Sequence, residues 1–553
     1  MYSKKSFLNF LLVYLFLQVL CVSPASADDW IKNIDDNTFV SQLSIPGTHD
    51  SGTGHGFSVG DIASAIAEYL GRTQEKNITE QWNCGIRCFD LRPAVDGSSL
   101  YVFHGIAKTN LSFSTAMSTL SNLVGNHPKE FAIVIIRHEK EGDNNSSLWK
   151  DKMSSLLGSI SDRIVNFSPM MKVKDARGKI LILSRDEYRS TPYGGYIYDW
   201  SNFTENAKIK RSGNEAPCSI QDYYDCTGSS GKSTKNDKIK SMLNKSMNEN
   251  TDPNRWFINH TSGYSKTINV LGKTIVTNDG YRENAAYQNS RIVDYLSSHY
   301  GSTGIVVMDY AGVDKSGDYQ TKGQKLINAV INNNSKEGPN SAYFRALSSI
   351  EPGAKYRIYT KVNDKKYYME ASGSLTSKSS KAGTFTFSRV EANNTEYKYG
   401  FNLLDAYFTN PALSGSNIVN NGQINTDQVS KRKDWEAQVF FLKSGKYAIR
   451  ATNAKGGNSG WGIAAKTFWS VDTGSSSPKP KYTFSQDYIW QLEKTSSSTR
   501  VSNLDLDGGA EATGISEPVN HQPKDNQVYD LMGRRVSNAG KGIYIINGRK
   551  VVK

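Results

Sequence analysis

The sequence has little cysteine and, beyond its first segment, no long apolar run. Only five of its 553 residues are cysteine. After the apolar stretch at residues 7–20, no segment is long and apolar enough to cross a bilayer as a helix. The sequence also lacks a nucleic-acid-binding motif, and its basic residues are spread along the chain rather than clustered. These absences argue against a protein with several membrane spans and against a nucleic-acid-binding protein.

The first 27 residues have the pattern of a secretory signal peptide. Lys4 and Lys5 form its charged region, residues 7–20 its apolar core, and residues 25–27 a small-residue cleavage site. The apolar core is too short to be a comfortable transmembrane helix. We therefore expect an exported protein, secreted or held at the cell surface, whose mature chain starts at Asp28.

Removal of the signal peptide would take away Cys21 and leave four cysteines in the mature chain. In an oxidising compartment this even number permits two disulfides. Local pairs are the simplest expectation, Cys84 with Cys88 and Cys218 with Cys226. A zinc site is the competing interpretation, although the spacings match no known pattern well. The sequence alone leaves the pairing open.

The composition is basic. The formal charge of +13 falls to +11 once the leader and its two lysines are removed. A basic surface favours acidic partners, and anionic lipid headgroups are the more economical interpretation because no nucleic-acid motif is present. We therefore expect a peripheral contact with a membrane surface.

Short apolar runs that end in polar residues recur over residues 28–345. Such runs are typical of parallel strands in a sheet covered on both faces. Helical patterns separate them, for example at residues 146–157 and 290–299. The alternation predicts an α/β protein with a (β/α)-barrel, whose active site gathers at the carboxyl ends of the strands. The apolar runs are residues 100–105, 131–139, 178–185, 256–260 and 303–310.

Polar side chains suited to proton transfer and anion binding fall at these predicted strand ends. Residues 43–53 join a His-Asp pair to glycines that let the backbone turn tightly and a substrate come close. Asp90 and Arg92 are two apart on a strand and so point to the same side, with a structural ion pair as the alternative interpretation. We expect a cluster at one mouth of the barrel, made by His49, Asp90, Arg92, His104, Arg137, Arg185 and Asp309.

At this point the chain resembles the bacterial phosphatidylinositol-specific phospholipase C family. The segments that carry the resemblance follow one another in the order typical of the family, which makes the set specific although no single member is. The resemblance implies a distorted TIM barrel, in agreement with the strand pattern. The segments are residues 44–53, 71–74, 89–92, 103–105, 177–180, 220–224, 258–262 and 308–310.

The resemblance implies a role for each catalytic side chain. His49 would be the general base and His104 the general acid, each worth roughly 100- to 10,000-fold. Asp309 would orient His49, Asp50 would pair with His104, and Arg92 would bind the phosphate and help activate the inositol 2-hydroxyl. Because an arginine supplies positive charge where eukaryotic relatives hold Ca²⁺, we expect no metal and no other cofactor.

Further residues are implied to bind substrate, again by resemblance. Arg185 and Asp222 match residues that bind inositol hydroxyls, Tyr224 lies along that pocket, and Asp90 and Arg137 complete the set. Arg137 departs from the lysine often found in relatives, which keeps the charge but changes its reach. For three polar residues near strand ends we expect structural hydrogen bonds only, namely His138, Glu139 and His260.

A short helix between the first two motifs is a candidate membrane contact. Ile62, Ile66 and Leu70 share one face of it, and Tyr69 adds an aromatic ring. The segment 264–276 is a second candidate for the rim. The alternative interpretation is that both segments pack inside the protein.

The composition changes beyond residue 345. Short strands with turns between them predict an all-β domain over residues 346–495, whose Tyr-x-Ile spacing resembles a β-trefoil of the ricin-B kind. A glycan-binding module is the functional interpretation, and a plain β domain without ligand is the alternative. Residues 496–526 predict a linker. Residues 527–553 resemble the C-terminal sorting tails of secreted Bacteroidetes proteins.

The leading hypothesis is a secreted enzyme that cleaves phosphatidylinositol to diacylglycerol and inositol 1,2-cyclic phosphate, with GPI anchors as a second candidate substrate. A rival from another class is a non-catalytic lipid- or glycan-binding surface protein on a decayed barrel. A third is an enzyme of this fold with another phosphodiester substrate. Intact acid–base residues argue against decay, and Arg92 argues against the metal that the third chemistry usually recruits.

Overall fold

The computed structural model describes most of the chain to residue 391 and shorter segments beyond it. The chain forms two compact units, Met1–Arg500 and Val501–Lys553. The predicted signal peptide, and the predicted linker apart from Ser496, lie outside the described residues. The described residues are 29–57, 67–139, 146–270, 273–370, 374–391, 399–403, 435–440, 446–453, 468–474, 477–483, 487–496, 528–529, 543–546 and 549–552.

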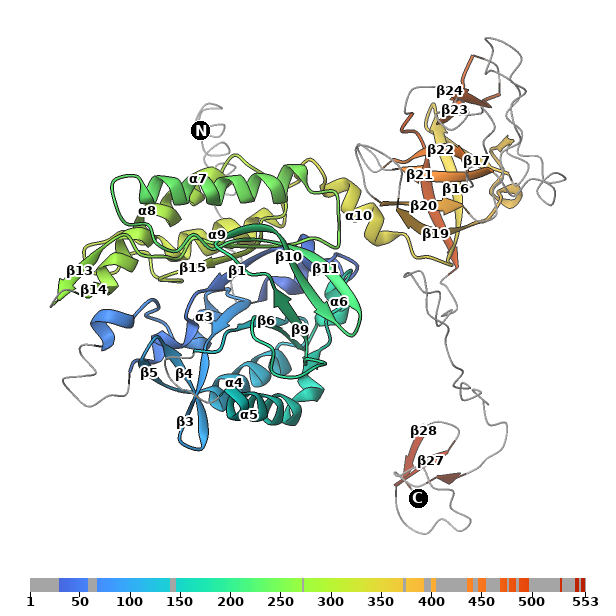
Figure 1. Ribbon diagram of the computed structural model, residues 1–553. Coiled ribbons are helices and arrows are strands. Elements are labelled where there is room, and N and C mark those ends of the chain that lie inside the picture. Colours follow the sequence, from blue (N-terminus) through green and yellow to red (C-terminus); the bar gives the residue numbers. More distant parts are fainter. Residues whose placement is uncertain are drawn as a thin grey trace, which may run out of the picture. The chain divides into compact units, whose positions relative to one another are not determined.

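A closed barrel forms the core of the N-terminal half, which confirms the predicted fold class (Figure 1). Its sheet runs in the order β6-β2-β1-β15-β12-β11-β10-β9-β8 and closes where β6 pairs with β8, while β7 pairs only with the first two residues of β8. The strands are β1 (Ser44–Thr48), β2 (Cys88–Leu91), β6 (Ala132–Ile136), β7 (Ile164–Val165), β8 (Ile180–Ser184), β9 (Gly195–Tyr198), β10 (Phe203–Arg211), β11 (Asn214–Gln221), β12 (Trp256–His260) and β15 (Gly304–Met308).

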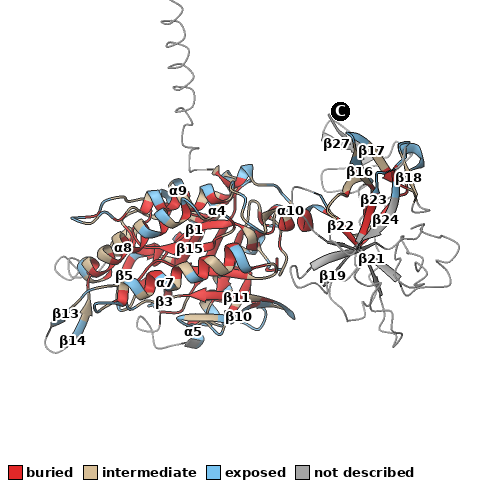
Figure 2. Cartoon of the chain, turned by 90° about the horizontal axis from the view of Figure 1, so that it is seen from above, coloured by how far each residue is buried: buried red, intermediate tan, exposed pale blue. Residues whose placement is uncertain are grey.

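Helices cover the outside of this barrel (Figure 2). Both faces are buried in β1, β2, β6, β8, β12 and β15, whereas β10 exposes one of its faces. Alternation along a strand divides the core into two layers. Ile305 and Val307 of β15 pack into the barrel interior, whereas Val306 and Met308 pack against the helices. The helices are α3 (Ile78–Asn83), α4 (Phe113–Asn126), α5 (Ser146–Ser159), α6 (Val173–Ala176), α7 (Gly231–Asn244), α8 (Asn278–Leu296), α9 (Gly323–Asn333) and α10 (Ser341–Ser349), with single turns η2 (Ile31–Asn33), η3 (Val40–Gln42), η4 (Ser51–His55), η5 (Ser161–Arg163) and η6 (Lys245–Glu249).

Two features depart from the predicted all-parallel sheet. The β10 strand runs antiparallel to both of its neighbours, since β10–β11 is a tight hairpin. The run 100–105 is a strand but not a barrel strand: it belongs to a separate antiparallel sheet of β3 (Pro93–Asp96), β4 (Ser99–His104) and β5 (Ala107–Ser112). A second small hairpin, β13 (Thr267–Val270) with β14 (Lys273–Val276), precedes α8.

None of the four described cysteines forms a disulfide, so the expected local disulfides are wrong in this structure. The reason is the direction of the side chains. Cys88 on β2 packs into the barrel interior, whereas Cys84 ends α3 and packs in the helix layer. Cys218 likewise faces the interior from β11, while the Cys226 thiol lies against the carbonyls of Tyr223 and Tyr224.

An all-β region follows α10, as predicted. Its strands pair antiparallel in the order β18-β17-β16-β19-β20-β21-β22-β23-β24, and β25 returns to pair with β16. The β-trefoil topology and the glycan partner stay predictions, as do the domain boundaries. The strands are β16 (Lys355–Val362), β17 (Lys365–Met369), β18 (Leu375–Thr376), β19 (Phe385–Glu391), β20 (Tyr399–Leu403), β21 (Trp435–Phe440), β22 (Ala448–Asn453), β23 (Phe468–Asp472), β24 (Lys479–Thr483) and β25 (Gln491–Ser496), with the turn η7 (Ser379–Lys381).

The second unit contains a small antiparallel sheet of β26 (Val528–Tyr529), β27 (Ile543–Ile546) and β28 (Arg549–Val552). The likeness of this segment to sorting tails stays a prediction. Among the described residues, no helix is both long and apolar enough to cross a membrane.

Candidate active site

Two neighbouring strands bring His49 and Asp309 together. β1 and β15 pair in parallel, with Thr48 opposite Met308, so the next residue of each strand emerges at the same end of the barrel. The His49 N–H donates to the Met308 carbonyl at 3.1 Å, which continues the ladder by one residue. The backbone turns sharply after each strand, because Asp50 and Tyr310 adopt left-handed conformations with φ of 46° and 52°. Such backbone strain in large residues gathers at functional sites.

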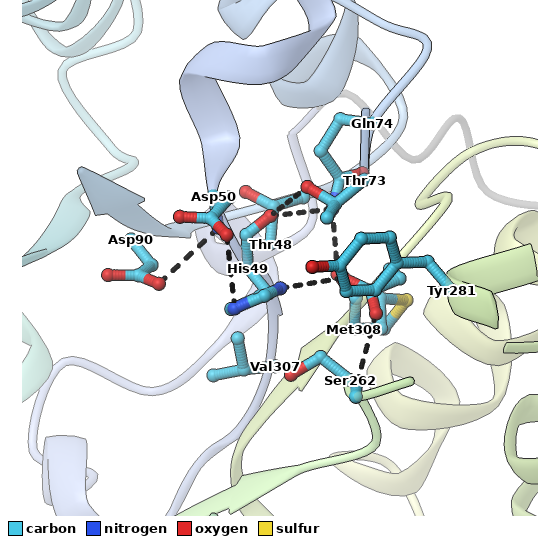
Figure 3. Close-up of polar contacts among 12 residues, drawn as sticks. Thr48, His49, Asp50, Thr73, Gln74, Asp90, Ser262, Tyr281, Val307 and Met308 are labelled. Atoms are coloured by element: carbon cyan, nitrogen blue, oxygen red, sulfur yellow. Dashed lines mark hydrogen bonds and ion pairs between the residues drawn. The ribbon is translucent and has the colours of Figure 1, made fainter. Parts of the chain in front are cut away.

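A buried glutamine holds the two strand ends in place. Gln74 lies beside His49 and Met308 (Figure 3), and its side-chain amide donates to the carbonyls of His49 at 2.9 Å and of Met308 at 2.8 Å. Its side-chain oxygen accepts from the Ala311 N–H at 3.0 Å. Gln74 belongs to the motif at residues 71–74, for which sequence reasoning found no role. Its contacts fix the backbone from which both functional side chains project.

The Asp309 carboxylate orients the His49 ring. Asp309 Oδ1 lies 2.8 Å from His49 Nδ1, and its Oδ2 accepts the Gly263 N–H at 3.1 Å. Both side chains are buried. Because a carboxylate can only accept, the contact places a proton on Nδ1 and directs Nε2 toward the site.

Asp50 bridges both histidines, a contact that sequence reasoning assigned to His104 alone. Its Oδ2 lies 3.2 Å from His49 Nε2 and 3.3 Å from His104 Nε2. Burial raises the pKa of Asp50, but Arg92 and the two histidines outweigh it and hold that pKa below its usual value. Burial lowers the pKa of His49, yet the Asp50 and Asp309 charges outweigh it and raise that pKa above its usual value.

The guanidinium of Arg92 spans the carboxylates beside the histidines. Its Nε lies 2.9 Å from Asp50 Oδ1, and its Nη2 donates to Asp90 Oδ2 at 3.1 Å. Burial opposes ionisation of Asp90, but the Arg92 charge outweighs it and lowers the Asp90 pKa strongly. Among the described residues, His49, Asp50 and Asp90 also bring metal-ligating atoms within 4.8 Å of one another. The guanidinium already pairs with both carboxylates, so a divalent cation there would be repelled.

A hydrogen bond at Nδ1 holds the His104 ring on the side opposite Nε2. Its Nδ1 donates to the Gly71 carbonyl at 2.7 Å, and this leaves Nε2 to face Asp50. The His104 and His49 rings lie 6.4 Å apart, centroid to centroid. The two imidazoles therefore approach one small volume from different sides, so one of them could take a proton there while the other gives one.

A cavity of about 290 Å³ adjoins this cluster and holds the remaining predicted residues. Three guanidinium groups face it, from Arg92, Arg137 and Arg185. Burial lowers the pKa of Arg185 to about 10, so the group keeps its charge at neutral pH. The cavity is lined by Arg92, Arg137, Arg185, Trp200, Ser201, Asn202, Asp222 and Tyr224.

The cavity wall is built from interlocking contacts. The Arg185 guanidinium stacks over Trp200 at 3.8 Å, and the Trp200 indole N–H donates to Asp222 Oδ2 at 3.0 Å. Burial raises the Asp222 pKa, but His260 and Arg185 outweigh it and lower that pKa. The Tyr224 ring lies 5.6 Å from that of His49, which joins the cavity to the histidine pair.

The three residues expected to make only structural hydrogen bonds differ in where they lie. His138 stacks on Trp149 at 4.3 Å, away from the cluster. Glu139 instead lies 3.8 Å from Arg92, and burial raises its pKa to about 7. His260 lies 6.2 Å from His49, and burial lowers its pKa to about 4. Their positions at strand ends were the available signal, as they were for Arg137 and Asp309.

Sequence reasoning gave no role to Trp200 or Tyr281. Trp200 follows β9 in a loop without a motif of its own. Tyr281 lies in the first turn of α8, far along the chain from the histidines, and its hydroxyl reaches the His104 ring. Tyr281 precedes the helical pattern predicted at residues 290–299, and a single tyrosine there carries no signal that would single it out.

The predicted membrane-contact residues lie partly outside the described chain. Ile62 and Ile66 fall among residues 58–66, whereas Tyr69 is exposed and Leu70 half-buried. Two further apolar side chains are exposed: Ile106, 80% exposed in the β4–β5 turn, and Ile268, 38% exposed on β13. Figures 1 and 2 both show β5 and the β13–β14 hairpin at one end of the barrel.

The chain is similar to bacterial phospholipases in its N-terminal half. It is 26% identical over 291 residues to a 1-phosphatidylinositol phosphodiesterase of Listeria monocytogenes, covering 51% of this chain and 80% of that protein. A Staphylococcus aureus protein of the same name is 22% identical over 304 residues, covering 52% of this chain and 89% of that one. The N-terminal half is homologous to these bacterial enzymes.

Two solved structures of bacterial phospholipases are also similar to this chain. The phosphatidylinositol-specific phospholipase C of L. monocytogenes has 25% sequence identity and a TM-score of 0.42, with 56% of this chain and 99% of that chain covered. A mutant of the S. aureus enzyme has 18% identity and a TM-score of 0.44, with 55% of this chain and 97% of that chain covered. No protein-family model matches the chain.

Proposed function

We propose that this protein is a phosphatidylinositol-specific phospholipase C that cleaves phosphatidylinositol to diacylglycerol and inositol 1,2-cyclic phosphate. One observation carries the proposal: two histidines, one oriented by a buried carboxylate, meet beside a guanidinium and an arginine-lined cavity. Homology of the barrel half to bacterial 1-phosphatidylinositol phosphodiesterases supports the same substrate. GPI anchors are a second substrate under this proposal, since they present a phosphorylated inositol to the same cavity.

His49 is the general base and His104 the general acid. His49 Nε2 takes the proton of the inositol 2-hydroxyl, whose oxygen attacks phosphorus, while Asp309 stabilises the imidazolium that forms. His104 Nε2 gives its proton to the diacylglycerol oxygen as the bond from phosphorus to that oxygen breaks. The contacts of Nδ1 with Asp309 and with the Gly71 carbonyl support these roles, because they leave each Nε2 to face the site.

Arg92 replaces a metal ion as the source of positive charge. Its planar fork reaches two carboxylates in the free protein, and a phosphate oxygen offers it the same kind of acceptor. Arg137 and Arg185 add charge on the cavity side, where Asp222 accepts from inositol hydroxyls and the Tyr224 ring covers the sugar face. We expect catalysis without a divalent cation.

The mouth of the barrel meets the membrane surface in this proposal, because the headgroup cannot reach the cavity otherwise. The exposed side chains of Tyr69, Ile106 and Ile268 support the idea, and burial of an Ile side chain contributes roughly 1.5–3 kcal/mol. A few such contacts give weak, reversible docking. Secretion or display at the cell surface follows from the predicted signal peptide and stays part of the proposal.

The test is turnover of phosphatidylinositol vesicles by the full-length protein in EDTA, followed by ³¹P NMR for the cyclic phosphate. We expect activity that EDTA leaves unchanged. Vesicles of phosphatidylcholine alone are the control and should release no phosphate ester. Activity that disappears in EDTA and returns with Ca²⁺ would overturn the metal-free mechanism, and no turnover of any inositol lipid would overturn the proposed function.

A further inference from the structure

A buried tyrosine reaches the proposed general acid from a distant helix. Tyr281 lies in the first turn of α8 and is 3% exposed. Its hydroxyl lies 3.4 Å from His104 Nε2 and 3.0 Å from the Tyr224 hydroxyl. The hydroxyl therefore stands between the nitrogen that handles the proton and an aromatic side chain of the substrate cavity.

The surroundings of His104 leave a task for this hydroxyl. The Gly71 carbonyl holds Nδ1 at 2.7 Å, but the ring can still pivot about that contact. At Nε2 the structure places Asp50 Oδ2 at 3.3 Å and the Tyr281 hydroxyl at 3.4 Å. Asp50 can only accept a hydrogen bond, so it suits the protonated ring alone. A hydroxyl can accept or donate, so it suits both protonation states.

We propose that Tyr281 is a positioning residue that holds the His104 ring in one orientation before and after His104 gives up its proton. In the protonated state Nε2–H is shared between the Tyr281 oxygen and the leaving oxygen, and the Tyr281 hydroxyl donates to the oxygen of Tyr224. After His104 protonates the leaving oxygen, the Tyr281 hydroxyl donates to the bare Nε2 and accepts from Tyr224. No proton leaves either tyrosine, so only the direction of two hydrogen bonds reverses.

The environment keeps both phenols neutral. Burial raises the pKa of Tyr281, and burial also raises that of Tyr224 well above its usual value. A phenol that cannot ionise near neutral pH remains a donor throughout the reaction. This inference rests on the proposed function, because it assigns Tyr281 to the acid of that reaction.

The competing explanation is that Tyr281 only fills space. Its ring packs with Tyr224 and Tyr264, and the ring centroids of Tyr281 and His104 are 5.8 Å apart. A packing role depends on the ring, whereas the proposed role depends on the hydroxyl. Tyr281→Phe separates the two because it removes the oxygen and keeps the ring.

The chain offers a matched control in Tyr264. Its ring lies in the same cluster, 6.4 Å from that of Tyr281, but its hydroxyl bonds to Asp225 rather than to a histidine. Tyr264→Phe therefore loses an equal amount of polarity from the same cluster without touching the His104 contact.

The kinetic experiment compares two leaving groups. Phosphatidylinositol needs protonation of its leaving oxygen, whereas inositol 1-(4-nitrophenyl phosphate) releases a stable phenolate and does not. We expect Tyr281→Phe to lower kcat on phosphatidylinositol by about 10- to 100-fold, a part of what a general acid contributes. Turnover of the nitrophenyl ester should fall less than threefold. Equal losses on both substrates, or no loss, would overturn the proposal.

A second readout is independent of turnover. In ¹⁵N-histidine-labelled protein, Tyr281→Phe should shift the Nε2 resonance of His104 and leave that of Nδ1 in place, while Tyr264→Phe shifts neither. If Tyr281→Phe does not fold, Tyr224→Phe, which removes the partner of the Tyr281 hydroxyl, should shift the same Nε2 resonance. An unshifted Nε2 in the folded variant refutes the contact even if the wild-type protein proves inactive on inositol lipids.

Discussion

The contact of Asp309 with His49 makes Asp309→Asn a demanding test of the proposed general base. Asp309 is fully buried, with Oδ1 2.8 Å from His49 Nδ1 and Oδ2 3.1 Å from the Gly263 N–H. An asparagine of the same shape has one acceptor and one donor. The Gly263 N–H requires the acceptor, so the amide NH₂ must turn toward His49 Nδ1.

This reversed contact changes the tautomer of the base. A donor facing Nδ1 needs a lone pair there, so the ring proton moves to Nε2, the nitrogen that should accept from the 2-hydroxyl. The equivalent change in a Ser-His-Asp triad lowers kcat about 10⁴-fold. We expect kcat/KM on phosphatidylinositol to fall by about 10³- to 10⁴-fold, equivalent to about 4–5.5 kcal/mol of transition-state stabilisation.

The assay is release of inositol 1,2-cyclic phosphate as a function of pH. Burial lowers the pKa of His49 while Asp50 and Asp309 raise it more, so removing the Asp309 charge lowers that pKa. The acid limb of the residual activity should therefore move to lower pH. Near-UV circular dichroism controls for folding. Activity above one tenth of wild type, or an acid limb that does not move, would refute the assigned role of Asp309.

Three further changes test other parts of the site. Arg92→Lys should lower kcat by about 100- to 1,000-fold, because an ammonium cannot span Asp50 and Asp90 as the guanidinium does; ³¹P NMR measures this. Glu139 has a folded pKa of about 7, raised by burial, so the wild-type protein loses stability as pH rises from about 4.5 through 7. The difference in free energy of unfolding between Glu139→Gln and wild type, measured by urea unfolding, should therefore shift in favour of the variant by up to roughly 3 kcal/mol from pH 4.5 to pH 8.5. The same difference at both pH values would contradict this. Ile106→Ser should weaken vesicle binding several-fold and spare turnover of water-soluble inositol cyclic phosphate, with its melting temperature unchanged; loss of both activities would count against docking.

The ends of the barrel strands could be predicted because the signal is local. A continuous apolar run followed by a polar residue identifies both the strand and the side chain that emerges from it. That signal found His49, Arg185 and Asp309 without reference to any partner. The alternation Phe89-Asp90-Leu91-Arg92 also predicted its faces, since Phe89 and Leu91 pack in the helix layer.

Other features depend on register and direction, which the local pattern does not contain. The strand that carries His104 leaves the barrel for a separate sheet, although its apolar pattern looks like a barrel strand. Cys84 and Cys88 are close in sequence, yet the end of a helix and a strand send their side chains into different layers. Proximity along the chain was the wrong guide to a disulfide in both predicted pairs.

The site itself shows why pairwise roles read from motifs are incomplete. Each motif supplies one side chain and suggests one partner, but a buried cluster of charges shares its contacts. Asp50 touches both histidines and Arg92, and Glu139 reaches the same guanidinium from the segment after β6. The pKa of Glu139 is raised because Arg92 is already paired with other carboxylates and burial then dominates. Charge balance of this kind is a property of the assembled site, so it emerges only once the strand ends have been brought together.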